Sequence, residues 1–424
     1  MDRFVGLIGI VLILTIAFLM SNNRKAINYK LVGTGLAVQI LLAVFILKVP
    51  LGKEIFGWLG AVVTKVLDFS HAGATFVFGP LVSSEIMSQA FGPNNAMIFF
   101  FNIIPTIIFV AVLVSVAYYF GIMQRIVKWV AIAVYKVMGV SGSEALSNVA
   151  SAFVGQVEAQ IMIKPYLKGM TMSELLASMS GSMACIAGGV MAVYISLGVP
   201  AEYLIAASLM AAPGALVISK IVWPETEISE TKGEVSLEIK KTDSNLVDAI
   251  SHGASDGLKI GLNVIAMLIG FIAIIALVDY VLGFIGAQLG SFGLSLSFIG
   301  IDIHTLSMKQ ILGSFFSLFA WAMGVPVPDI QTAGSLMGTK MVINEFVAYL
   351  DLAAVKETLH PKTLIITSFA LCGFANFSSI AIQVGGIGEL VPERRKDLAR
   401  LGFRALICGT LASYLSATLA GILV

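Results

Sequence analysis

Apolar segments of about 20 residues recur along this sequence, and they constrain its fold more than any other feature. As a helix, a segment of that length crosses the hydrocarbon core of a bilayer, which is about 30 Å thick. Eight segments are predicted to span the membrane: 4–21, 31–48, 97–121, 174–197, 201–222, 258–285, 363–388 and 401–424. Because only 12% of the residues are charged, against about 25% in a typical soluble domain, we expect an all-α integral membrane protein.

The charge and cysteine content exclude two other kinds of protein. A formal net charge of +1 provides no basic field, so nucleic acid is not expected as a partner. Cys185, Cys372 and Cys408 all lie in apolar segments, where neither a disulfide framework nor a zinc site is expected.

Basic residues in the short loops predict the orientation of the chain. They gather after the first, third and fifth segments and before the last one. All these loops are cytoplasmic if both termini are periplasmic and if two polar-interrupted stretches, 142–168 and 328–357, re-enter the membrane without crossing it. Lys309, Lys356 and Lys362 then fall on the opposite side and are exceptions to the rule.

The two re-entrant stretches resemble each other. Each follows a Met-Gly-Val sequence, at 138–140 and 323–325, and runs through small residues to a glutamate, Glu158 or Glu345. About 30 residues later each half has another interruption, at 184–190 and 374–380. Since the first unit starts inside and the second outside, this is the pattern of an inverted repeat. A binding site is then expected where broken helices meet near the membrane midplane.

Polar residues in the first re-entrant stretch point to a site. An ionised carboxylate in hydrocarbon costs at least about 2.5 kcal/mol, so Glu158 and Glu345 must face a protein interior or a wet cavity. Gln156 and Glu158 would face different directions on an unbroken helix, and Gly155 lets the backbone turn between them. We therefore predict a helical hairpin whose tip offers free backbone groups to a polar ligand. Alternatively, these polar groups bond one another and only pack the hairpin.

The stretch "CGFANFSSI" adds further polar groups in an apolar segment. Asn376 and Ser379 share a helical face and can donate and accept hydrogen bonds, and Phe374 offers a flat ring. With the two glutamates, these groups suit vicinal hydroxyls and a flat heterocycle with amide-like edges. Small polar residues also join membrane helices to one another, so this stretch alone is a weak indication of a binding site.

The stretch "GASDG" (253–257) fits the Gly-x-Ser-x-Gly pattern of a hydrolase nucleophile, which needs a strand before it and a helix after it. Here the motif follows no strand. It lies at the end of a polar linker, 224–257, which we expect to be mobile. The four-residue spacing of Gly253, Gly257 and Gly261 instead predicts a closely packed helix face.

The sequence resembles the concentrative nucleoside transporter family over nearly its whole length. The stretches that carry the resemblance are "GQVE" (155–158), "AISHGASDGLKIGLNVIAMLIGF" (249–271), "INEFVAY" (343–349) and "CGFANFSSI" (372–380). Eukaryotic members have extra N-terminal helices that are absent here, so the resemblance indicates a bacterial member in the cytoplasmic (inner) membrane.

The resemblance implies a homotrimer in lipid, with eight transmembrane helices and two re-entrant hairpins in each subunit, whose transport domain moves like an elevator against a scaffold. The implied divisions are 1–95 (scaffold helices 1 and 2 and an extracellular connection with short amphipathic helices), 96–141 (scaffold helix 3 and a cytoplasmic interfacial helix), 142–223 (first half of the transport domain), 224–306 (cytoplasmic linker and scaffold helix 6) and 307–424 (extracellular interfacial helix and second half of the transport domain).

The resemblance also implies a nucleoside substrate such as uridine, and no covalent chemistry. The residues implied to hold the base are Gly155, Gln156, Val157, Glu158, Val190 and Phe374. Those implied to hold the ribose are Glu345, Asn376 and Ser379. No tightly bound cofactor is implied, only a coupling ion, H⁺ or Na⁺.

The chain departs from the family's sodium-coupled pattern. That pattern has hydroxyl residues at the positions of Val157 and Cys185, and asparagine at that of Ser151. The cation-site positions that match the family are Ser151, Val154, Cys185 and Ile186. Sodium prefers oxygen ligands and a thiol is a poor one, whereas a proton needs only a buried carboxylate. The sequence therefore favours proton coupling, with sodium as the alternative.

Rival functions stay open at this point. They are a symporter for another polar solute such as a nucleobase, a membrane-embedded hydrolase, and a channel. Two acidic residues in the predicted site argue against a dicarboxylate or any other anion as the substrate.

Overall fold

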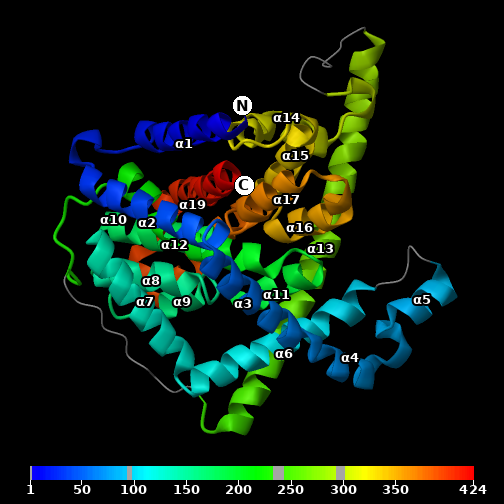
Figure 1. The fold of residues 1–424 in the computed structure, drawn as a ribbon, viewed down its shortest axis with the longest axis horizontal. Coiled ribbons are helices and arrows are strands. Elements are labelled where there is room, and N and C mark those ends of the chain that lie inside the picture. Colours follow the sequence, from blue (N-terminus) through cyan, green and yellow to red (C-terminus); the bar gives the residue numbers. More distant parts are fainter. Residues whose placement is uncertain (1, 93–97, 233–242, 293–300) are drawn as a thin grey trace.

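The computed structural model describes residues 2–92, 98–232, 243–292 and 301–424, and its regular elements there are α-helices and short 3-10 helices (Figure 1). The α-helices are α1 (Asp2–Leu19), α2 (Tyr29–Leu47), α3 (Pro50–Asp68), α4 (Ser70–Phe78), α5 (Ser84–Phe91), α6 (Phe99–Tyr119), α7 (Ile122–Met138), α8 (Gly142–Ser151), α9 (Glu158–Ile161), α10 (Met172–Ala184), α11 (Gly188–Ser196), α12 (Ala201–Val222), α13 (Leu246–Ser291), α14 (Met308–Ala322), α15 (Ile330–Val342), α16 (Glu345–Val355), α17 (Pro361–Leu371), α18 (Phe377–Leu390) and α19 (Arg395–Leu423).

The C-terminal helix α19 is the centre of the fold. It contacts α1, α2, α10, α12, α17 and α18. Gly6 of α1 lies against Ile422 of α19, and Figure 1 shows both chain ends close together. This agrees with the expectation that both termini lie on one side of the membrane. Which side they occupy stays a prediction.

Six helical segments in the described residues are long and apolar enough to cross a membrane. They are α2, α6, the α10–α11 pair, α12, α13 and the segment Pro392–Leu423. The predicted spans 4–21 and 363–388 differ from a simple spanning helix. The first has an apolar part of Val5–Leu19, and the second is divided into α17 and α18.

The region 50–92 contains more helix than the predicted short amphipathic pieces. Its first helix, α3, has 19 residues and packs against α2 and α12. The shorter α4 and α5 follow, and in Figure 1 they form an arm that projects away from the bundle. The remaining part of the predicted connection, 93–95, lies outside the described residues.

The prediction of a mobile linker at 224–257 is wrong for most of that range. Ser229 and Thr231 are buried, and the Thr231 carbonyl accepts a hydrogen bond from the Gly142 N–H at 3.0 Å. Helix α13 begins at Leu246 and runs for 46 residues. Its polar first turns look like a linker in sequence because they are solvated, not because they are irregular. Residues 233–242 lie outside the described residues.

The glycine face predicted for α13 is confirmed. A Cβ on Gly253 would lie 2.7 Å from the Val112 Cα, and one on Gly257 would lie 2.6 Å from the Ile108 Cα, both in α6. Because the Gly-x-Ser-x-Gly stretch lies inside a continuous helix, it lacks the strand–turn–helix context that a hydrolase nucleophile needs.

Two capping boxes set where α8 and α10 begin. Ser141 accepts a hydrogen bond from the Glu144 N–H, and the Glu144 side chain accepts one from the Ser141 N–H at 2.8 Å. Thr171 and Glu174 make the same reciprocal pair at the start of α10. Both follow the pattern Ser/Thr-x-x-Glu, which satisfies N–H groups that the first helical turn leaves unpaired.

The predicted hairpin at 142–168 has unequal arms. Its first arm is α8, and its second is the four-residue α9 followed by turns. The stretch 328–357 is more regular, with α15 and α16 separated only at 343–344. We refer to α8–α9 as the first helical pair and to α15–α16 as the second.

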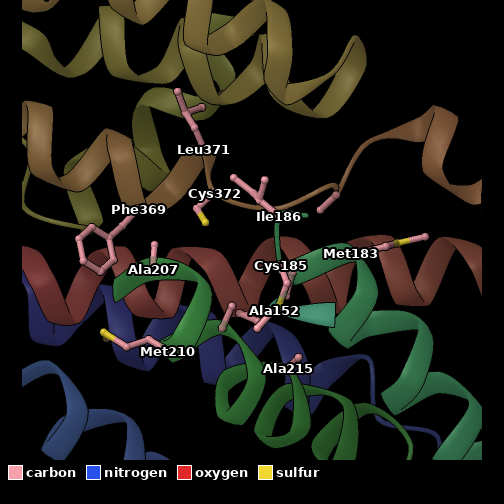
Figure 2. Close-up of a cluster of buried hydrophobic side chains, with 14 of the residues drawn as sticks. Ala152, Met183, Cys185, Ile186, Ala207, Met210, Ala215, Phe369, Leu371 and Cys372 are labelled. Atoms are coloured by element: carbon pink, nitrogen blue, oxygen red, sulfur yellow. The ribbon is translucent and has the colours of Figure 1, made fainter. Parts of the chain in front are cut away.

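The two broken helices cross at their breaks, 185–187 between α10 and α11 and 372–376 between α17 and α18. The Phe374 N–H donates to the Cys185 carbonyl at 3.2 Å. Gly373 has φ +124°, and a Cβ there would lie 2.5 Å from the Ala184 carbonyl oxygen, so glycine is needed for conformation and for space. Figure 2 shows Cys185 and Cys372 in the buried cluster at this crossing.

Candidate functional site

Glu345 lies at the centre of a buried polar cluster. Its side chain opens α16, and the residue is 6% exposed. Its Oε2 accepts from Asn376 Nδ2 at 2.9 Å, and its Oε1 accepts from the Tyr194 hydroxyl at 3.2 Å. The helix N-terminus also favours a carboxylate at this place. These partners compensate a carboxylate that would otherwise be costly to bury.

Two asparagines form the N-caps of the helices that restart here. Asn344 Oδ1 accepts from the Val347 N–H, and Asn376 Oδ1 accepts from the Ser379 N–H, both at 2.9 Å. Capping uses the amide oxygen of Asn376, so its amide nitrogen is free to donate to Glu345. The break in each helix therefore also orients the side chains of the site.

The tip of the first helical pair joins the same cluster. Gln156 Nε2 donates to Ser379 Oγ at 3.3 Å, and Gln156 Oε1 accepts from Gln383 Nε2 at 3.3 Å. A continuous series of hydrogen bonds thus runs from Glu345 through Asn376 and Ser379 to Gln156. The structure brings together four of the five polar residues that the sequence singled out in the two halves of the chain, and Glu158 is the exception.

Glu158 differs from Glu345 in its surroundings. It is exposed, and its carboxylate folds back over Gly155 without a hydrogen bond or ion pair to a described residue. A Cβ on Gly155 would lie 2.8 Å from the Glu158 Cδ. The φ of Gly155 is not positive, so the turn does not need glycine as we predicted, and the absence of a side chain there lets the Glu158 carboxylate lie over the backbone.

The remaining predicted base-binding residues are half-buried and surround the tip. Val157 packs against Gly386 of α18, where a Cβ would come within 2.7 Å of its Cγ2. Val190 lies in the first turn of α11, and Phe374 lies in the break before α18. These three side chains provide apolar surface beside the polar series.

The four candidate cation-site residues are buried, and side-chain or backbone groups of Ser151, Val154 and Cys185 have protein partners. The Ser151 hydroxyl donates to the Ser147 carbonyl at 2.7 Å. The Cys185 thiol is 3.8 Å from the Ser208 carbonyl, and the Cys185 carbonyl accepts from Phe374. Val154 and Ile186 complete the set. Ser151 provides the one side-chain oxygen of this set, so most of the ligands for a hard cation would have to be backbone carbonyls.

Sequence reasoning missed two members of the cluster. Gln383 follows Ser379 by four residues and Asn376 by seven, so a search for polar residues at helical spacing finds it. Tyr194 lies in an apolar stretch whose tyrosine is indistinguishable in sequence from a core residue. Only the fold brings its hydroxyl to Glu345.

Comparison with known families decides what this site belongs to. The model described as "Na+ dependent nucleoside transporter C-terminus" matches residues 203–421, and the corresponding N-terminal model matches residues 8–81. A third model, described as "Nucleoside recognition", matches residues 100–201. The chain belongs to the concentrative nucleoside transporter family.

Relatives of this nucleoside transporter match nearly the whole chain. An uncharacterized transporter of Haemophilus influenzae is 42% identical over 425 residues, 99% of this chain and 97% of its own length. The nucleoside permease NupC of Helicobacter pylori is 38% identical over 424 residues, again 99% and 97%. Sodium/nucleoside cotransporter 1 of Mus musculus is 36% identical over 438 residues, 100% of this chain and 64% of its own length.

Solved structures of the bacterial transporter CNTnw share the fold. Its inward-facing substrate-bound state has a TM-score of 0.91 and 40% identity, covering 100% of this chain and 98% of CNTnw. A doubly substituted CNTnw in an outward-facing state has a TM-score of 0.92 and 39% identity, with the same coverage. The predicted family and all-helical membrane architecture are thus confirmed. The family consists of multi-pass nucleoside transporters with a coupling ion, and not of enzymes.

Proposed function

We propose that this chain is a secondary active symporter that imports nucleosides, with uridine as a substrate, across a bacterial cytoplasmic membrane. The observation that carries the proposal is the hydrogen-bonded series from Glu345 to Gln156, which joins both halves of the chain at their helix breaks. Each member can exchange a protein partner for a ligand group without leaving its position.

The two ends of this series suit the two parts of a nucleoside. Glu345 and Asn376 form a carboxylate–amide pair, which suits vicinal ribose hydroxyls because one group accepts and the other also donates. Gln156 offers an amide to a base edge, and Val157, Val190 and Phe374 offer apolar surface to its faces. Glu158 and the space beside Gly155 complete the base side.

Contacts on both faces of the bundle support an elevator in which the two repeats move as one body. Arg394, just before α19, donates to the carbonyls of Lys168 at 3.0 Å and Met170 at 2.6 Å, where the first helical pair ends. Lys356, just after α16, donates to the Gly198 carbonyl at 3.4 Å, where α11 ends. Residues 142–223 and 307–424 would belong to the mobile unit. Helices α1 and α2, which the sequence assigned to the scaffold, pack on α12 and α19 of that unit and would move with it, while α6 and α13, which pack on each other, would belong to the scaffold.

The homotrimer belongs to the same proposal. Helix α13 is apolar but only 17% of its spanning window is buried within one subunit. An apolar face of this length is suited to lipid or to other copies of the chain. We assign this apolar face to contacts with both lipid and the other subunits. We also place the N- and C-termini in the periplasm.

For the coupling ion we propose a proton, with sodium as the alternative. Ser151 brings the one side-chain oxygen among the four candidate cation-site residues, and the Cys185 carbonyl already accepts from the Phe374 N–H, which leaves a poor set of oxygen ligands for sodium. Glu345 or Glu158 is the carboxylate that would carry the proton. Backbone carbonyls near Val154 and Ile186 would have to supply a sodium site.

Uptake of labelled uridine into proteoliposomes tests the function. We expect saturable uptake that other nucleosides reduce by competition and that an imposed ion gradient drives above equilibrium. A nucleobase that competes better than uridine would favour the carrier of another solute, and flux without saturation or competition would indicate a channel. The control is Gln156→Leu, which removes the amide that joins the two halves and should abolish uptake.

A further inference from the structure

A series of hydrogen bonds lies behind the tip of the first helical pair, with Gln160 at its centre. Gln160 belongs to α9, and its side chain is fully buried, at 0% exposure. Its Oε1 accepts from the Ser178 hydroxyl at 2.7 Å, and its Nε2 donates to Ser182 Oγ at 2.8 Å. Since Ser178 and Ser182 are one turn apart on α10, the amide spans one turn of that helix.

The series continues to Ser151, the last residue of α8. Ser182 Oγ and Ser151 Oγ are 2.9 Å apart, and Ser151 donates its proton to the Ser147 carbonyl. A hydroxyl has one proton, so Ser182 must be the donor to Ser151. Each hydroxyl in the series then donates its one proton, and the order is Ser178 to Gln160, Gln160 to Ser182, Ser182 to Ser151, and Ser151 to Ser147.

This series connects the same elements that a cation would connect. A cation held by Ser151 and Val154 on one side, and by Cys185 and Ile186 on the other, would join the end of α8 to the break after α10. The Gln160 amide already bridges α9 and α10, and Ser182 extends the bridge to Ser151. The result is a neutral link across the same junction.

We propose that Gln160 is a positioning residue that orders the tip of the first helical pair in place of a bound cation. The tip, residues 152–157, then keeps its shape in the absence of sodium, and Gln156 stays directed toward Ser379. The inference rests on the proposed role of this region in coupling. It adds to that proposal that the Gln160 amide takes the structural place of the cation.

Hydrogen–deuterium exchange on the protein in nanodiscs tests the role of Gln160 without substrate or transport. Peptides covering 152–161 are compared in sodium chloride and in choline chloride at equal ionic strength. Wild-type protein should exchange equally in both salts. Gln160→Leu leaves Ser178 and Ser182 without their amide partners, so its tip should exchange roughly tenfold faster or more in choline. Sodium should slow that exchange, because Ser182, no longer fixed by the amide, can turn its proton away from Ser151 and leave the Ser151 oxygen open to the ion.

The matched control is Gln39→Leu. Gln39 is also fully buried, and its Nε2 donates to the Met210 carbonyl at 3.2 Å and to Ser416 Oγ at 2.9 Å, away from the tip. This variant should leave the exchange of 152–161 unchanged. If Gln160→Leu does not fold, the same exchange measurement is made on Ser182→Ala. This variant removes the hydroxyl shared by Gln160 and Ser151 with little change in volume.

Three results would overturn the proposal. They are wild-type exchange at the tip in Gln160→Leu, equal acceleration in both salts, and a wild-type tip that is protected only in sodium. None of these depends on uridine uptake. If the protein did not transport nucleosides, the exchange result would still stand. If it did transport them but its tip were protected from exchange only in sodium, only the role of Gln160 would be rejected.

Discussion

The Tyr194 hydroxyl donates to Glu345 Oε1 at 3.2 Å across a separation of 151 residues in sequence. The Tyr194 ring also stacks on that of Tyr349, with centroids 4.2 Å apart. Helix α11 of the first repeat therefore holds the carboxylate of the second. Binding at Glu345 depends on both halves of the chain.

Glu345→Gln should weaken uridine binding roughly tenfold or more, since a hydrogen bond to a charged acceptor contributes about 1.5–3 kcal/mol. Deoxyuridine analogues that lack the contacted hydroxyl should lose part of this sensitivity. Isothermal titration on folded, purified protein measures both. Equal uridine affinity in the variant and the wild type would contradict the assignment of Glu345 to the ribose.

Tyr194→Phe removes one donor to Glu345 and keeps the ring stack. A neutral donor contributes about 0.5–1.5 kcal/mol, so uridine affinity should fall by roughly two- to tenfold. Tyr349→Phe is the matched control, because the Tyr349 hydroxyl donates to the Ser368 carbonyl at 2.8 Å and not to the site. A loss of affinity as large in Tyr349→Phe as in Tyr194→Phe would mean that the aromatic stack, and not the hydroxyl, matters.

Gly155→Val should abolish uptake and leave the trimer intact. A side chain there would push the exposed Glu158 carboxylate off Gly155 and fill the place proposed for the base, and the three atoms nearest to its Cβ all belong to Glu158 and none to α13, the helix assigned to the oligomer. Size-exclusion chromatography with light scattering reports assembly, and uridine uptake reports function. Gly33→Val is the control, since nothing lies within 4 Å of a Cβ at that position. Failure of Gly155→Val to assemble would show a general structural role.

Uptake should rise when external pH falls at fixed membrane potential, and it should survive replacement of sodium by choline. The reason is that the candidate cation site has one side-chain oxygen, that of Ser151, while Glu345 and Glu158 are available to carry a proton. Uptake that disappears in choline and returns with sodium would reverse this prediction. It would mean that carbonyls near Val154 and Ile186, with Ser151, suffice for sodium.

Lys220→Met should destabilise the protein by roughly 3–5 kcal/mol, because it leaves Glu144 as a buried charge without its partner. The Lys220 Nζ and Glu144 Oε2 atoms are 2.6 Å apart, and the two side chains are 4% and 3% exposed. The midpoint of thermal unfolding measures the change. Adding Glu144→Gln to Lys220→Met should recover part of the loss, and a further drop of equal size would show that the two groups act independently.

Much of the fold and site could be predicted because both depend on local contrasts in polarity. Apolar length indicates a spanning helix, and a carboxylate, an amide or a hydroxyl inside an apolar segment marks a place where the helix breaks or where a ligand binds. Glu345, Asn376, Ser379 and Gln156 are all of this kind, and the structure joins them. Their roles toward a nucleoside stay predictions.

The errors have a physical cause in common, which is that a residue's partner can lie far away in sequence. Lys309 and Lys356 were exceptions to the loop-charge rule, yet each has a specific partner. Lys309 pairs with Asp351 at 2.7 Å, and Lys356 donates to the Gly198 carbonyl at the end of α11. Such lysines hold helices together, so they carry little information about orientation.

The central position of α19 has a consequence for biosynthesis. The helices around it, α1, α2, α10, α12, α17 and α18, are all made earlier on the ribosome. Their inward faces stay uncovered in the membrane until the last 29-residue helix is inserted. The bundle therefore closes only once α19 has been made. A chain truncated before Arg395 would keep the other spanning segments but would lack the helix on which they assemble.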